Sequence, residues 1–135
     1  MMPLVAASAA VIFVLGLLHL IYTFHGPKLL PRDRDLPAQM QRSALVLTRE
    51  TTVWRAWIGF NASHSLGAML FGTVYGYLAL AKPAMLANSP YLLTVGGALL
   101  LAYAWLGRRY WFSVPFRGIV LALLLYAAGV IAALV

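Results

Sequence analysis

The sequence predicts an all-α fold, a transmembrane bundle of four helices. Of the 135 residues, 63% are hydrophobic and only 10% are charged, whereas soluble domains average about 45–50% apolar and about 25% charged residues. The apolar residues gather into four long runs, and the positive charges fall mainly between them. Lipid is therefore the expected solvent for most of the chain, and residues 1–135 are expected to form one transmembrane domain.

Each apolar run is close to the roughly 20 residues that a helix needs to cross the hydrocarbon core. The runs predict helices over about 3–24, 54–81, 91–107 and 114–135. Because unpaired backbone groups are not tolerated in hydrocarbon, each run has to be helical. The first run lacks the basic start of a cleavable signal peptide, so it is expected to remain as a spanning helix.

The connection between the first two helices is the longest polar segment. Three prolines break its first half. In its second half, from about 38 to 53, Met40, Ala44 and Leu47 recur at helical spacing. This pattern predicts either an amphipathic helix on the membrane surface or an extension of the second spanning helix.

The distribution of lysine and arginine predicts the topology. Six of these residues lie between positions 28 and 55 and three between 108 and 117, whereas the middle connection has only Lys82. Positive residues stay on the cytoplasmic side, so the first and third connections are expected inside and both chain ends outside the cytoplasmic (inner) membrane. This explanation of the net charge of +7 makes nucleic acid an unexpected partner.

Polar residues inside the second predicted helix point to a functional site, because such residues are costly in a membrane. Asn61 and His64 are three positions apart and share a face. At about 1.5 Å per residue they lie about 9 Å and 13–14 Å from the inner boundary, and His19 of the first helix lies about 7–8 Å from it. If the first and second helices are antiparallel neighbours, the residues at these depths would lie close together. We therefore expect a polar pocket in the cytoplasmic half.

Other residues are expected to complete this pocket. The predicted ligand-binding set is His19, Thr23, Trp57, Asn61, His64 and Tyr103, with Phe60 in the wall and Glu50 and Arg55 at the mouth. Imidazole and amide groups among apolar helices suit the polar head of a lipid or another small apolar molecule. No catalytic residue or metal ligand is assigned, because the chain has no cysteine and no carboxylate in a predicted span.

Three alternatives stay open. The polar side chains could serve only to join helices. The chain could be a non-catalytic subunit of a larger membrane complex or a homo-oligomer, since Gly59, Ser63 and Gly67 form a small-residue face. His19 and His64 could also ligate a b-type haem. The sequence decides neither the cofactor nor whether the protein is an enzyme.

Two stretches, GLLHLIYTFHGPKLLPRD and TRETTVWRAWIGFNASHSLGAMLFG, resemble a family of small bacterial membrane proteins with four predicted helices. The pattern FNASHSLG, Phe60 to Gly67, is the most specific part, and the resemblance covers roughly the first sixty per cent of the chain. That family has no assigned activity, so it implies architecture only. Size and helix number are also similar to the EXPERA group of sterol-binding proteins, but their intramembrane carboxylates have no counterpart in this sequence.

Overall fold

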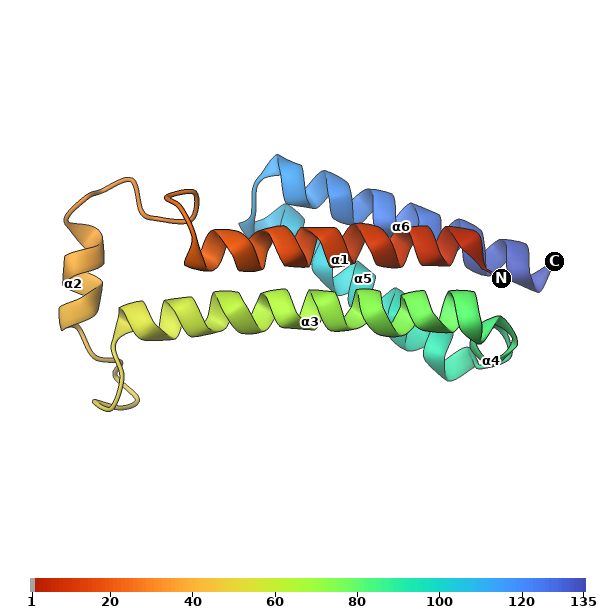
Figure 1. The fold of residues 1–135 in the computed structure, drawn as a ribbon, viewed down its shortest axis with the longest axis horizontal. Coiled ribbons are helices and arrows are strands. Elements are labelled where there is room, and N and C mark those ends of the chain that lie inside the picture. Colours follow the sequence, from red (N-terminus) through yellow and green to blue (C-terminus); the bar gives the residue numbers. More distant parts are fainter. Residues whose placement is uncertain (1) are drawn as a thin grey trace. The chain divides into compact units, whose positions relative to one another are not determined.

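The computed structural model describes residues 2–135, which form six helices joined by loops (Figure 1). The helices are α1 (Pro3–Phe24), α2 (Leu36–Arg42), α3 (Val53–Ala81), α4 (Pro83–Ala87), α5 (Pro90–Tyr110) and α6 (Ser113–Leu134). The all-α prediction is confirmed, and the four long helices lie where the apolar runs predicted them.

Three helices, α1, α5 and α6, are long and apolar enough to cross a membrane. The longest helix, α3 with 29 residues, is not among them. Asn61, His64 and the serines beside them lower the hydropathy of its first half.

Local sequence signals begin several of these helices. The Thr52 hydroxyl accepts a hydrogen bond from the backbone N–H of Arg55 at 3.2 Å, which caps α3. Ser89 caps α5 in the same way, from Leu92 N–H at 3.3 Å. Proline occupies the first position of α5, where its missing N–H costs no helical hydrogen bond.

The predicted helix over about 38–53 is wrong in extent. Only Leu36–Arg42 is helical, as α2, and 43–52 form a loop. Ala44 and Thr52 pair as an isolated antiparallel bridge, and Val53 N–H donates to the Ser43 carbonyl at 2.9 Å. The loop is therefore closed at its neck by backbone pairing, which competes with the helical pattern that the sequence suggested.

The chain divides into two compact units, with one boundary inside α1 and the other inside α3. Unit 1 comprises the residues up to Leu15 together with Ala68–Val135, and unit 2 comprises Gly16–Gly67. Each unit has its own internal packing.

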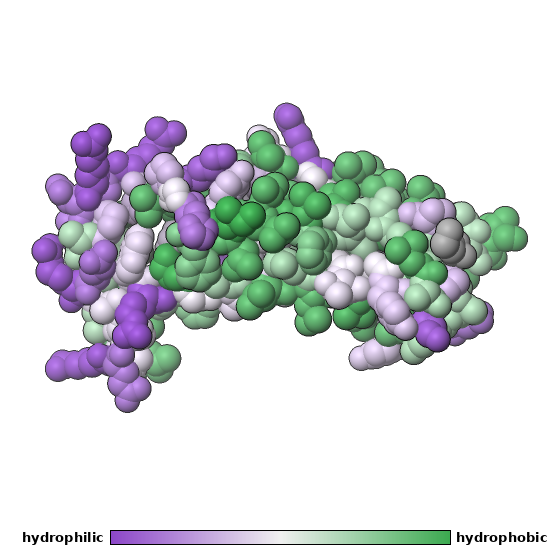
Figure 2. Space-filling model, viewed as in Figure 1, coloured by the Kyte–Doolittle hydropathy of each residue, from purple (hydrophilic) through white to green (hydrophobic). Residues whose placement is uncertain are grey.

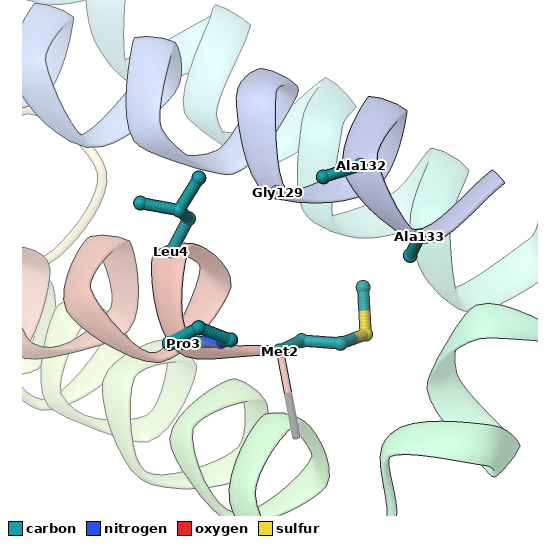
Figure 3. Close-up of a pocket in the computed structure, with 6 residues that line it drawn as sticks. All are labelled: Met2, Pro3, Leu4, Gly129, Ala132 and Ala133. Carbon is teal, nitrogen blue, oxygen red and sulfur yellow. The ribbon is translucent and has the colours of Figure 1, made fainter. Parts of the chain in front are cut away.

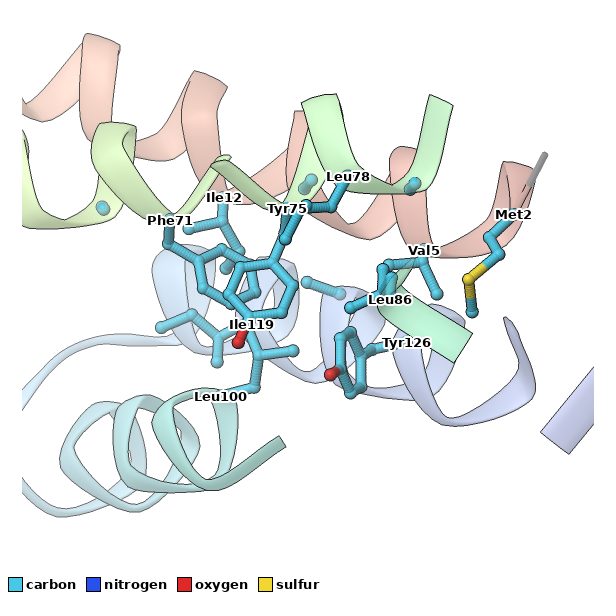
Figure 4. Close-up of a cluster of buried hydrophobic side chains, with 14 residues drawn as sticks. Met2, Val5, Ile12, Phe71, Tyr75, Leu78, Leu86, Leu100, Ile119 and Tyr126 are labelled. Atoms are coloured by element: carbon cyan, nitrogen blue, oxygen red, sulfur yellow. The ribbon is translucent and has the colours of Figure 1, made fainter. Parts of the chain in front are cut away.

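Unit 1 surrounds one hydrophobic cluster to which five helices contribute (Figure 4). Val5 and Ile12 of α1, Leu86 of α4 and Leu100 of α5 are almost completely buried. The short helix α4, which the sequence did not predict, brings Leu86 into this cluster. Removing any of these large side chains would leave a cavity in a close-packed interior.

Within unit 1, α1 and α3 run antiparallel and approach closely. A Cβ atom added to Gly72 would lie 2.5 Å from the Phe13 Cβ and 2.7 Å from the Ala9 carbonyl oxygen. Further along the pair, Met2 N–H donates to the Ala79 carbonyl at 2.9 Å. Gly72 is therefore required for this approach, because the atoms that face it belong to or adjoin the backbone of α1.

In unit 1, α6 also packs antiparallel to α1. The buried Ser8 hydroxyl donates to the Ala122 carbonyl at 2.7 Å, and a Cβ atom on Gly129 would lie 2.9 Å from the Val5 nitrogen. A serine that bonds to the backbone of a neighbouring helix is a common way to join membrane helices.

Two tyrosines fasten α5 to α3 and α6 within unit 1. Tyr75 of α3 donates to the Leu92 carbonyl at 2.7 Å, and Tyr126 of α6 donates to the Leu93 carbonyl at 2.9 Å. Gly96 makes room for both rings, because a Cβ there would lie 2.5 Å from the Tyr126 hydroxyl and 2.6 Å from Tyr75 Cε1.

Unit 2 contains the end of α1, the first connection with α2, and the beginning of α3. Just past α1, Gly26 adopts a φ of +78°, a left-handed conformation that suits glycine and ends helices. Six of the ten lysine and arginine residues and all three acidic residues lie in this unit, which has a net charge of +6 − 3 = +3.

Candidate functional site

The histidine cluster, defined as His19, Asn61 and His64, lies within unit 2 between α1 and α3. His19 Nε2 lies 2.9 Å from Asn61 Oδ1. The His19 and His64 rings meet edge to face, with centroids 5.2 Å apart and an interplanar angle of 82°. The structure thus brings together the three residues that the helical spacing placed at similar depth.

The orientation of Asn61 determines the tautomer of His19. The Asn61 Nδ2 donates to the Trp57 carbonyl at 2.8 Å, a role that only the amino end of the amide can fill. Its oxygen therefore faces His19 and has to accept, so His19 carries a proton on Nε2. In the neutral ring, Nδ1 is then the atom with a free lone pair.

Hydroxyl groups near the histidine cluster bond back to their own helices. Thr23 donates to the His19 carbonyl at 2.7 Å, and Ser65 donates to the Asn61 carbonyl at 2.8 Å. Both side chains are buried. The Thr23 proton is therefore already used, and Thr23 supports the backbone at His19. Ser65 supports the backbone at Asn61 in the same way, although nothing in the sequence favours Ser65 over Ser63 for this role.

The remaining predicted residues take different places. Trp57 orients Asn61 through its carbonyl, and its ring stacks on Trp54 with centroids 5.5 Å apart. Glu50 lies in the 43–52 loop and Arg55 in the first turn of α3, both exposed. Tyr103 belongs to unit 1, where it packs against the hydrophobic cluster, so its place at the histidine cluster stays a prediction.

The chemistry available at the histidine cluster is hydrogen bonding. All three side chains are half-buried, and Phe60 beside them is 73% exposed. Two imidazoles and an amide can donate to and accept from a hydroxyl, carbonyl or phosphate group. An exposed aromatic ring next to such groups suits a molecule that is polar at one end and apolar at the other.

Metal and haem binding fit this arrangement poorly. Among residues 2–135, no group of three or more histidine, cysteine, aspartate or glutamate side chains could hold a metal ion. A bis-histidine haem needs the iron and the porphyrin plane between its two imidazoles, but His19 and His64 are in edge contact.

A second feature of the surface is a recess of about 110 Å³ in unit 1 (Figure 3). It is lined by Met2, Pro3, Leu4, Gly129, Ala132 and Ala133. None of these side chains has a polar or titratable group, so the recess offers no chemistry to a reacting molecule.

Hydrophobic and hydrophilic side chains gather on different parts of the surface. Figure 2 shows hydrophobic side chains over the long helices, and hydrophilic side chains gathered around α2 and the adjoining loops. Large apolar residues of α3 in unit 1 are exposed on one face, namely Leu70, Val74, Tyr77 and Leu80. A continuous apolar face of this kind is unfavourable in water and ordinary in lipid.

Comparison with known proteins gives no relative from which a function could be transferred. No protein-family model, no curated protein and no solved structure matches the chain. The resemblance of FNASHSLG to a small bacterial family therefore stays a prediction, and the function has to be argued from the residues themselves.

Proposed function

We propose that this chain is a membrane protein with four spans that binds an amphiphilic small molecule, such as a lipid, at the histidine cluster. The observation that carries the proposal is the hydrogen bond between His19 and Asn61. It orients an imidazole so that its Nδ1 is an acceptor, next to a second imidazole, on a half-buried surface.

The contacts of α3 support its role as the fourth span. In unit 1 it runs antiparallel to α1, itself long and apolar enough to cross a membrane. Its 29 residues extend over about 43 Å, more than the roughly 30 Å of a hydrocarbon core. The exposed apolar residues from Leu70 to Leu80 would then face lipid.

Four spans place the positive connections on one side of the membrane. The connection with α2 and the ends of α5 and α6 next to the turn that joins them carry most of the lysine and arginine residues, so both regions would face the cytoplasm under the positive-inside rule. The termini and α4 would lie on the opposite side of the cytoplasmic membrane.

Cysteine labelling tests the number of spans, and the natural chain has no cysteine to interfere. Single substitutions Asp33→Cys and Asn88→Cys lie on either side of α3. If α3 crosses the bilayer, an impermeant maleimide labels them from opposite sides of the membrane. Labelling of both from the same side would contradict the fourth span.

Native mass spectrometry in a mild detergent tests the binding site. We expect a retained lipid in the natural protein and its loss from a variant with both His19→Phe and His64→Phe. Phenylalanine keeps two aromatic rings in contact but removes the nitrogens. The matched control is His25→Ala, because His25 is exposed and lies outside the histidine cluster. The same lipid bound to the double variant, with unchanged helix content, would overturn the proposal.

A second candidate is an assembly partner in a larger membrane complex. It is favoured by Gly59, around which a Cβ atom would find nothing within 4 Å, and by the exposed Ser63 one turn later. Small residues on an open face allow another helix to approach. Affinity purification in mild detergent separates the two candidates, because a single stoichiometric partner protein would favour assembly over lipid binding.

A further inference from the structure

The loop over 43–52 exposes apolar side chains that no part of unit 2 covers. Val46 and Leu47 expose 110% and 91% of their reference areas. They are neighbours in sequence at the far end of a loop whose neck is closed by the Ala44–Thr52 bridge. Figure 1 shows this loop, in yellow, beside the beginning of α3.

Hydrogen bonds within the loop hold its backbone in this conformation, and the loop does not fold over its apolar residues. The Ser43 carbonyl accepts from Val53 N–H at 2.9 Å, and the Thr48 hydroxyl accepts from Glu50 N–H at 3.1 Å. The first bond joins the two ends of the loop, and the second closes a turn just after Leu47. Two adjacent apolar side chains presented in this way favour an apolar partner over water.

Charges around the loop identify the kind of partner. Arg42 and Arg49 flank the apolar pair in the sequence, and Arg55 lies just beyond the neck of the loop. The only acidic residue between positions 42 and 55 is Glu50. All four are exposed. Arginines around an apolar tip are the combination that binds an anionic lipid surface, because the side chains enter the headgroup region while the guanidinium groups meet phosphates.

We propose that the 43–52 loop is an interfacial anchor, in which Val46 and Leu47 insert among the headgroups of anionic lipids and Arg42 and Arg49 contact their phosphates. This contact is separate from the histidine cluster. It would hold the first connection against the membrane that the long helices cross, and so fix the beginning of α3.

Spin labels in lipid nanodiscs test the anchor. The reporter is Thr48→Cys, which leaves both apolar residues in place, and the comparison position is Gln41→Cys in α2. In discs of phosphatidylcholine with phosphatidylglycerol, we expect the label at 48 to collide more with oxygen, which dissolves in lipid, than with a water-soluble nickel chelate. The label at 41 should show the opposite preference.

Two variants separate the apolar and the charged contributions. Val46→Ser with Leu47→Ser should abolish the oxygen preference at position 48. Arg42→Gln with Arg49→Gln should reduce it, as should discs of phosphatidylcholine alone. Because Thr48→Cys removes the hydrogen bond to Glu50, a second reporter at Leu45→Cys, which keeps that bond, has to give the same result.

Three results would overturn the anchor. A label at 48 as open to the nickel chelate as the label at 41 would place the loop in water. Equal insertion in neutral and anionic discs would remove the role of the arginines. Shielding from both reagents would indicate a protein contact. A label at Leu124→Cys, on the exposed face of α6, distinguishes these results from failure of the membrane assignment itself, since a water-accessible label there would overturn both proposals.

Discussion

The two units of the molecule use polar side chains in opposite ways. In unit 1 the hydroxyls of Ser8, Tyr75 and Tyr126 each donate to a backbone carbonyl of another helix. All three residues are buried. In unit 2 His19 bonds to another side chain, Asn61, and the rings and amide of the histidine cluster are only half-buried.

This difference separates hydroxyl groups whose protons are used within the fold from the side chains of the histidine cluster, for which we propose a ligand. A hydroxyl that donates its only proton to a neighbouring carbonyl has nothing left to donate to a ligand. An imidazole has a second nitrogen, so the His19–Asn61 bond leaves an acceptor for another molecule. Unit 1 is therefore expected to respond to substitution with a loss of stability, and unit 2 mainly with a change in binding.

The glycines show the same contrast. Added Cβ atoms would collide with neighbours at Gly72, Gly96 and Gly129 in unit 1, whereas Gly59 in unit 2 has nothing within 4 Å. The close helix approaches at Gly72, Gly96 and Gly129 thus all lie in unit 1. Three predictions follow from the comparison, in order of decreasing effect.

Gly72→Ala should cause the largest loss of stability, about 3 kcal/mol, because the new methyl group collides with Phe13 and with the Ala9 carbonyl and so overpacks the α1–α3 contact. Unfolding in a detergent titration measures the change. Gly76→Ala is the matched control, since its Cβ would be 3.7 Å from Ala9, an ordinary contact. Equal losses in the two variants would contradict the close approach at Gly72.

Gly96→Ala should cost about 2 kcal/mol, less than Gly72→Ala, because the atoms in the way are tyrosine side chains that can move. Thermal unfolding in detergent micelles is the measurement. Adding Tyr126→Phe removes the hydroxyl that lies 2.5 Å from the new methyl group and should recover part of the loss. Additive losses in the double variant would show that this hydroxyl is not what Gly96 accommodates.

Asn61→Ala should have the smallest effect on stability, about 0.6 kcal/mol, the average for hydrogen bonds between membrane helices. Its effect should instead appear at His19. With Asn61 present, the neutral ring carries its proton on Nε2, and without it both tautomers should be populated. The ¹⁵N chemical shifts of His19, recorded where the ring is neutral, report this ratio. An unchanged ratio in the variant would refute the tautomer assignment.

Much of the fold could be predicted from the sequence because its causes are local. Runs of apolar residues long enough to cross hydrocarbon set the positions of α1, α3, α5 and α6, and proline and capping residues set several of their ends. The 43–52 loop could not be predicted in this way. Its apolar residues have helical spacing, but the segment forms a loop in which the backbones of Ala44 and Thr52 pair. This pairing links residues eight positions apart.

The composition of the chain and the spacing of its residues predicted the helical class, the apolar runs and the candidate polar residues, because transfer from water to lipid depends on these two properties. The spacing also indicated that His19 and Asn61 lie at similar depth. The packing of the helices was needed to show that their side chains meet, that Asn61 fixes a tautomer, and which glycines face another helix. Those outcomes depend on the rotation of each helix about its axis, which is set by packing against neighbours distant in sequence.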